Sequence, residues 1–291
     1  MSVTDLAALN ATLCGQSAHL SDDSPTLAER TGAQPSDPDL ISTATVNGAS
    51  ARLSDFPGLV KMEPREFRPG GAIASGHCGA TRIAEDWFLT AAHCLDDDYD
   101  EVSLIVGAES LTSPWAKRIE ARASICHAGY GGASGSYVND IALVRINSAD
   151  QADLETVPIT AYGPTDEPLA PFHYAQAGMA GWGLTAFNGQ LSDTLLSAEL
   201  KLVRSGPAAL YVYSQNGAGP CIGDSGGPLF ITETSGQKRL VGVLSVVEQN
   251  SETGGFCQGD YGARYTNVQG YQNWIQSVIQ HCEQTPQLCG L

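Results

Sequence analysis

A chain of 291 residues is long enough to bury a sizeable core, and 42% hydrophobic with 16% charged residues is the composition of a folded globular protein. The formal net charge of −17 argues against a nucleic-acid partner, because phosphates would be repelled. No uninterrupted apolar run is long enough to cross a bilayer, so we expect no membrane span. The acidic balance is explained best by a surface that keeps the protein in solution, with a preference for cationic substrates as the alternative.

Residues 1–44 differ in composition from the rest of the chain. Ser, Thr, Ala, Asp and Pro are frequent there, and Pro25, Pro35 and Pro38 interrupt any regular element. Such a tract is not expected to be stable alone. We interpret residues 1–44 as a leader or pro-segment, which stays tied to the body of the protein if Cys14 forms a disulfide bond.

From residue 45 onward, short apolar runs alternate with turn residues, a pattern typical of an all-β protein. One helix is predicted near the C-terminus, where Trp274, Ile275, Val278 and Ile279 share one helical face that we expect to pack on the body. The predicted strands are 102–106, 141–146, 176–181, 198–203, 228–231 and 240–247.

Eight cysteines are spread along the chain without a CxxC pair, which indicates disulfides formed in an oxidising compartment. We therefore expect a secreted or extracellular protein, with the periplasm as a further possibility. Zinc is the alternative, because His77-Cys78 and His93-Cys94 form two His-Cys pairs, although zinc ligands usually come in closely spaced pairs.

Three local sequences carry candidate chemistry: TAAHC at 90–94, NDIALV at 139–144 and CIGDSGGPL at 221–229. Taken singly, His93 could be a core histidine and Asp140 a turn residue. A serine hydroxyl such as that of Ser225 needs an adjacent base to act as a nucleophile, and a histidine held by a buried carboxylate supplies one. Glycines at 223 and 226 let the backbone turn sharply, so that the N–H groups of Gly223 and Ser225 can form an oxyanion hole.

In their order and local motifs, His93, Asp140 and Ser225 resemble the catalytic triad of the chymotrypsin-like serine proteases. The resemblance covers about residues 45–280 and includes Cys78-Gly79, Gly181-Trp182-Gly183, Val243-Leu244-Ser245 and the stretch 264–268. It implies two antiparallel six-stranded β-barrels with a C-terminal α-helix: a first barrel at 45–155 with His93 and Asp140, and a second at 156–291 with Ser225. It also implies the disulfides Cys78–Cys94 and Cys221–Cys257, and leaves three possible pairings for Cys14, Cys126, Cys282 and Cys289.

The resemblance also predicts a zymogen. Family members are usually activated by cleavage before an Ile-Val-Gly-Gly-like start, after which the new amine pairs with the aspartate before the nucleophile, here Asp224. Residues 45–48 align with that start, but Thr45 is atypical and residues 42–44 contain no basic side chain. We therefore expect an activating protease that accepts alanine, or a cleavage elsewhere.

The substrate-binding positions depart from those of trypsin. Gly219 stands where trypsin has the acid that selects Arg and Lys, and Val247 narrows the predicted entrance. We therefore expect small or medium apolar side chains before the cut bond, unless Asp260 restores a basic preference. The substrate-binding residues predicted by the resemblance are Gly219, Pro220, Ser245, Val247 and Ala263.

The sequence thus predicts a monomeric serine endopeptidase that cleaves proteins or peptides through an acyl-enzyme, without a cofactor. The acidic run 96–101 is interpreted as a solvated loop rather than a calcium site, because its ligand spacing does not form a cage, and no metal is expected. A non-catalytic homologue that uses the same fold for binding is the alternative.

Overall fold

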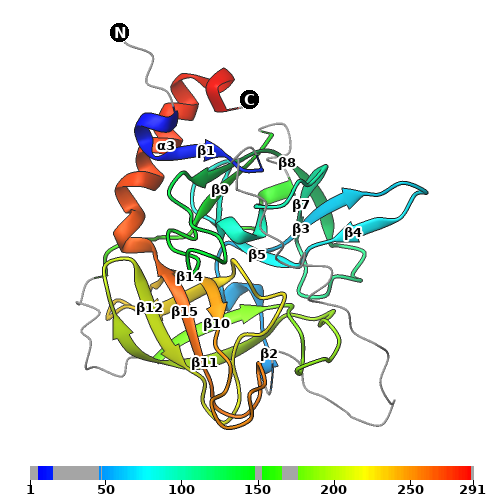
Figure 1. The fold of residues 1–291 in the computed structure, drawn as a ribbon, viewed down its shortest axis with the longest axis vertical. Coiled ribbons are helices and arrows are strands. Elements are labelled where there is room, and N and C mark those ends of the chain that lie inside the picture. Colours follow the sequence, from blue (N-terminus) through cyan, green and yellow to red (C-terminus); the bar gives the residue numbers. More distant parts are fainter. Residues whose placement is uncertain (1–5, 16–45, 47, 148–152, 166–175, 290–291) are drawn as a thin grey trace.

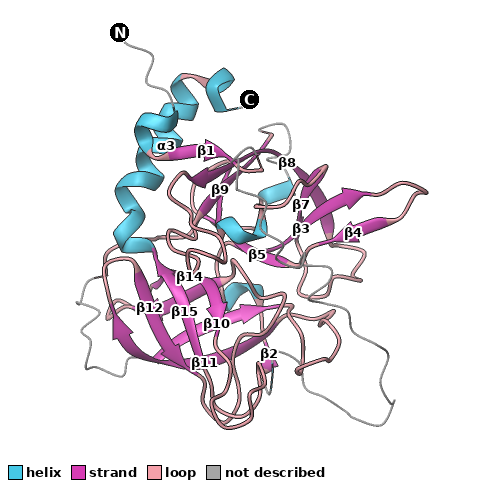
Figure 2. Cartoon of the chain, in the orientation of Figure 1, coloured by secondary structure: helices cyan, strands magenta, loops and turns pink. Residues whose placement is uncertain are grey.

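The structure is a computed structural model that describes residues 6–15, 46, 48–147, 153–165 and 176–289. Two sheets lie one above the other in the view of Figure 1, and each closes on itself as a barrel of six antiparallel strands. Helix α3 (Gln272–Gln284) follows the second barrel in sequence and runs along the side of the molecule toward the first. Strands predominate over helices (Figure 2). The expected architecture of two six-stranded barrels with a C-terminal helix is confirmed.

The first barrel follows the strand order β8-β7-β3-β5-β6-β9 and is closed by pairing of β8 with β9. Strand β4 (Ile73–Ser75) forms a hairpin with β3, and β1 (Ala11–Leu13) adds to the free edge of β8. The barrel strands are β3 (Leu59–Phe67), β5 (Cys78–Arg82), β6 (Trp87–Thr90), β7 (Glu101–Val106), β8 (Lys117–His127) and β9 (Ala142–Ile146).

The second barrel follows the order β10-β13-β14-β15-β12-β11 and is closed by pairing of β10 with β11, while β2 (Ala49–Ser50) adds to β11. Its strands are β10 (Gln176–Gly181), β11 (Leu196–Ser205), β12 (Ala209–Tyr213), β13 (Pro228–Thr232), β14 (Lys238–Val247) and β15 (Gly262–Asn267). Short 3-10 helices cover Leu6–Leu9, Leu53–Asp55, Ala92–Cys94, Val268–Tyr271 and Pro286–Cys289.

The N-terminal segment and the C-terminal helix pack against each other and against the first barrel. Trp274, Ile275 and Val278 of α3 are buried in the core cluster that also holds Leu6, so the predicted apolar face does pack on the body. The indole N–H of Trp274 donates to the carbonyl of Asn10 at 3.1 Å. None of the helices in the described part of the chain is long and apolar enough to cross a membrane.

All eight cysteines form disulfides, including the two pairs implied by the family resemblance. The four cysteines whose pairing was open form Cys14–Cys126 and Cys282–Cys289. The zinc alternative is therefore wrong, because a sulfur in a disulfide cannot serve as a thiolate ligand. Cys14 ties the N-terminal segment to the first barrel.

Candidate active site

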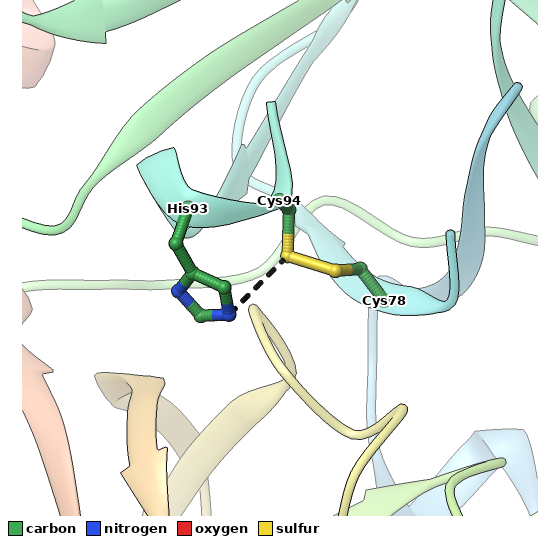
Figure 3. A group of neighbouring side chains, drawn as sticks. All are labelled: Cys78, His93 and Cys94. Carbon is green, nitrogen blue, oxygen red and sulfur yellow. Dashed lines mark hydrogen bonds between the residues drawn. A yellow bond between two sulfur atoms is a disulfide. The ribbon is translucent and has the colours of Figure 1, made fainter. Parts of the chain in front are cut away.

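His93 is presented by the short 3-10 helix Ala92–Cys94 that follows β6. The next residue, Cys94, is bonded to Cys78 of β5, so a disulfide anchors the backbone beside the histidine (Figure 3). The imidazole is mostly enclosed, with 11% of its side chain exposed, and its Nε2 lies 3.9 Å from Cys94 Sγ. The ring of Tyr137 meets it edge-on, with 5.8 Å between ring centroids.

Asp140 lies just before β9 and is fully buried. Its carboxylate holds His93 at two points: Oδ1 accepts the backbone N–H at 2.9 Å, and Oδ2 lies 2.8 Å from Nδ1. Ser245 Oγ donates to Oδ2 at 2.6 Å, and Thr266 Oγ1 donates to the Asp140 carbonyl at 2.7 Å. A carboxylate at Nδ1 favours the tautomer with its proton on that nitrogen, which leaves the lone pair of Nε2 for proton uptake.

Ser225 lies in the loop before β13, and this loop packs on β5 and the end of β6 in the first barrel. Gly79 N donates to the Ser225 carbonyl at 2.7 Å. Gly226 lies so close to Thr90 and Ala91 that a Cβ there would stand 3.1 Å from Ala91 N. The structure therefore brings the Ser225 loop against residues 79 and 90–91 of the first barrel, just before His93.

The peptide between Ile222 and Gly223 has a defined orientation. Leu184 N donates to the Ile222 carbonyl at 2.7 Å, and the carbonyl and N–H of a trans peptide point in opposite directions. The N–H of Gly223 is therefore turned away from Leu184. Gly223 adopts φ +94°, a conformation that suits glycine, as its predicted role in a sharp turn requires.

Asp224 is buried beneath this loop, where its carboxylate accepts from Gly183 N at 2.7 Å and Cys221 N at 2.9 Å. Burial raises its pKa to about 6, against the lowering effect of those two N–H groups and of Lys61. Lys61 is itself buried, and its Nζ donates to the Gly223 carbonyl at 3.4 Å. Sequence reasoning missed Lys61, although a lysine inside the apolar run at 59–62 was a visible signal.

The predicted activation residue Thr45 lies outside the described residues. Its neighbour Val46 is buried in a cluster with Leu184, Tyr261 and the Cys221–Cys257 disulfide. The Val46 carbonyl accepts a hydrogen bond from Gly219 N at 3.3 Å.

Among the predicted substrate-binding residues, some lie in tightly packed or strand-paired positions, and one, Ser245, donates a hydrogen bond to Asp140 instead. A Cβ on Gly219 would lie 2.8 Å from the hydroxyl of Tyr261, which donates to the Pro220 carbonyl at 2.9 Å. Val247 pairs with the buried Ala263 across β14 and β15. The hydroxyl of Ser245, by contrast, is used on Asp140.

Asp260, the alternative source of a basic preference, is exposed on a loop. Its Oδ1 accepts the backbone N–H of Gly217 at 2.8 Å. This carboxylate therefore links its own loop to the segment after β12, two residues before Gly219.

Two groups of potential metal ligands stand out in the sequence, and their surroundings differ. Cys78, His93 and Cys94 place three potential ligand atoms within 4.8 Å, but the two sulfurs are bonded to each other (Figure 3). In the acidic run 96–101, Asp96 accepts from the Tyr130 hydroxyl at 2.9 Å and Asp100 accepts from Phe67 N at 2.6 Å. Each of these two carboxylates accepts a hydrogen bond from another part of the first barrel, and the interpretation of this run as a solvated loop stays a prediction.

Two closed barrels, with a buried Asp–His pair on one and a glycine-rich serine loop from the other packed beside it, define the class of two-barrel serine proteases. The family model described as Trypsin matches residues 45–275, and the chain belongs to this family. Granzyme M of Rattus norvegicus is 29% identical over 220 residues, which cover 69% of this chain and 79% of that protein. Venom serine protease 34 of Apis mellifera is 27% identical over 264 residues; the match covers 82% of this chain and 59% of that relative.

Proposed function

We propose that this chain is an active serine endopeptidase with Ser225 as nucleophile, His93 as general base and Asp140 as the residue that orients the histidine. The observation that carries the proposal is the two-point hold of buried Asp140 on His93, beside a loop whose Gly223 N–H is already oriented. A binding protein has no need for a histidine with one fixed tautomer next to an oriented amide.

The chemistry follows from these atoms. Ser225 Oγ attacks the carbonyl carbon of the scissile peptide while its proton passes to His93 Nε2, and Asp140 stabilises the imidazolium that forms. The oxyanion is stabilised by the N–H groups of Gly223 and Ser225. The imidazolium then protonates the leaving amine, and water, deprotonated by His93, releases the acyl group from Ser225.

The proposal extends to activation and substrate preference. Val46 is buried next to Gly219, which favours cleavage of the bond before Thr45. The new N-terminal amine of Thr45 would then enter the region of Asp224. Near Gly219 the nearest side-chain polar group is the hydroxyl of Tyr261, a residue whose pKa burial raises, so that side chain is neutral. A pocket with a neutral bottom and Val247 on one wall favours substrates with a small or medium apolar side chain before the cut bond.

The four disulfides fit an oxidising compartment outside the cytosol.

A fluorophosphonate probe tests the proposal directly. The protein is treated before and after limited proteolysis near residue 45, and the label is located by mass spectrometry, with Ser225→Ala as the matched control. We expect label on Ser225 of the wild type and none on the variant. If Ser225 is not labelled under any activation condition, the proposed peptidase activity is contradicted and a non-catalytic binding homologue is favoured. A peptide library on the activated form tests specificity, and strong cleavage after Arg or Lys would support the Asp260 alternative.

A further inference from the structure

A buried lysine of the first barrel reaches the nucleophile loop of the second. Lys61 lies in β3 between Val60 and Met62, and only 1% of it is exposed. Its Nζ donates to the carbonyl of Gly223, two residues before Ser225. The lysine therefore contacts the same residue whose N–H is a proposed oxyanion donor.

Both peptide groups that flank Gly223 are thereby fixed from outside the loop. Leu184 N holds the carbonyl of the preceding peptide at 2.7 Å, and Lys61 Nζ holds the carbonyl of the following one at 3.4 Å. The N–H of the following peptide also donates to the Cys221 carbonyl at 3.0 Å, so this plane is held from within the loop by Cys221 and from the first barrel by Lys61. Without Lys61, the Gly223–Asp224 peptide would lose its acceptor contact with the first barrel.

Lys61 also provides a positive charge close to a buried negative one. Burial lowers its pKa to about 8, while the charges of Asp224 and Glu63 act in the opposite direction. His77 is the other titratable group that faces it, and burial followed by the Lys61 charge lowers the pKa of that histidine to about 4, so His77 is neutral. Two buried ionised groups cost more free energy than two apolar ones of the same size, so this pair is costly for stability alone.

We propose that Lys61 is a positioning residue that holds the oxyanion-hole peptide and balances the charge of Asp224 in the intact chain, before any cleavage. This inference rests on the proposed function, because it concerns the geometry around Ser225. This role differs from that of the new N-terminal amine formed on cleavage, because the ammonium group of Lys61 in the first barrel is already close to Asp224 before cleavage. The intact chain is therefore expected to have measurable reactivity, and cleavage is expected to raise it.

The test compares wild type, Lys61→Met and Lys61→Arg, each as intact chain and after cleavage near residue 45. The rate of fluorophosphonate labelling of Ser225 is measured for all six samples. Lys61→Met is expected to slow labelling of the intact chain by about 10- to 100-fold, less than the roughly 100- to 1,000-fold loss when an oxyanion donor is removed, because the Gly223 N–H is still present. The loss is expected to be smaller in the cleaved form, where a new amine can face Asp224, and Lys61→Arg is expected to recover part of the rate. Lys117→Met, at an exposed position on β8, is the matched control.

The outcomes separate this inference from the proposed function. No label on wild-type Ser225 in either form overturns the proposed function. Label only after cleavage, or equal rates for wild type and Lys61→Met in the intact chain, overturns the role of Lys61 and leaves the protease intact. Equal losses in both forms would show a general structural defect and also overturn it.

A second measurement needs no activity. In the wild type, Asp224 is protonated below about pH 6 and Lys61 is neutral above about pH 8, so their attraction exists between these values. The urea midpoint of Lys61→Met is therefore expected to lie further below that of the wild type at about pH 7 than at about pH 5, where Asp224 is protonated. Above about pH 8 the gap is expected to widen again, because burial lowers the Lys61 pKa and the unfolded wild type then binds more protons than the folded one. A difference that does not vary with pH would contradict the charge pairing. Lys61→Gln, which keeps an N–H donor without the charge, replaces Lys61→Met if that variant does not fold.

Discussion

At the scale of single residues, the nucleophile loop depends on a glycine that no other residue can replace. Gly226 has φ +72°, and a Cβ there would lie 2.6 Å from the Gly79 carbonyl and in contact with Thr90 Oγ1. Backbone strain and steric overlap therefore act together, and both barrels would have to move to relieve them. The glycine is required because two chain segments meet there.

We expect Gly226→Ala to lower the free energy of unfolding by more than about 3 kcal/mol, or to prevent folding, because the loop cannot stay against β6. Gly236→Ala is the matched control: this glycine also has positive φ, at +84°, but a Cβ there would meet nothing within 4 Å. Its cost is expected to be about 1–2 kcal/mol, the backbone term alone. Urea unfolding of the two variants checks the difference, and equal losses would refute the steric argument.

The residues with a distinctive local motif could be predicted from the sequence, and those without one could not. His93, Asp140 and Ser225 stand in short sequences whose glycines, alanines and cysteines are themselves informative. The donor hydroxyls of Ser245 and Thr266 are ordinary strand residues, and only the folded chain places them on Asp140. Lys61 is visible in the sequence as a lysine inside an apolar run, but its role could not be predicted, because its partner Gly223 is distant in sequence.

At the scale of elements, the N-terminal segment is part of the first barrel's sheet. Strand β1 pairs with β8 from Ala11 opposite His127 to Leu13 opposite Ile125, and the Cys14–Cys126 disulfide follows directly. The 3-10 helix before it contributes Leu6 to the core. A cut near residue 45 therefore leaves a covalent link between the two products.

After such a cleavage, we expect one band at the size of the whole chain in a non-reducing gel and two bands after reduction. In a denaturing gel, the double variant Cys14→Ser/Cys126→Ser should release the fragment without reductant, because the β1–β8 pairing is not covalent. Its free energy of unfolding in the uncleaved form is expected to fall by about 2–4 kcal/mol, because the bond closes a long loop. Two bands from the wild type without reductant would contradict this pairing.

Several apolar strands could be predicted, whereas short apolar strands such as β6 and β12 and strands interrupted by charges were missed. The prediction at 176–181 matches β10, and 228–231 falls within β13. Strand β8 was not predicted, since its outward positions carry charges such as Glu120 while Ile119 and Ile125 are buried. Strand β3 contains Lys61, Glu63 and Pro64, and a proline with charges argues against a strand until the folded chain shows what buries them.

At the scale of the whole molecule, the site exists only because the barrels hold each other in register. Strands β14 and β15 of the second barrel supply the hydroxyls of Ser245 and Thr266 to Asp140 of the first. In return, Gly79 N and Lys61 Nζ of the first barrel hold the loop of the second. Each barrel thus positions the functional group that the other presents.

We expect Thr266→Val, which keeps the shape of the side chain, to lower kcat/KM about tenfold, equivalent to about 1.4 kcal/mol, because the Asp140 carbonyl loses its donor. Ser245→Ala is expected to lower it at least as much, because it removes a donor from the carboxylate that orients His93. Both losses should appear mainly in kcat, since substrate binding does not use these hydroxyls. Ser235→Ala, in an exposed turn, is the control that should leave both constants unchanged. If either hydroxyl could be removed with kcat unchanged, Asp140 would be held by its own barrel alone, and the barrels would meet at the site without supporting it.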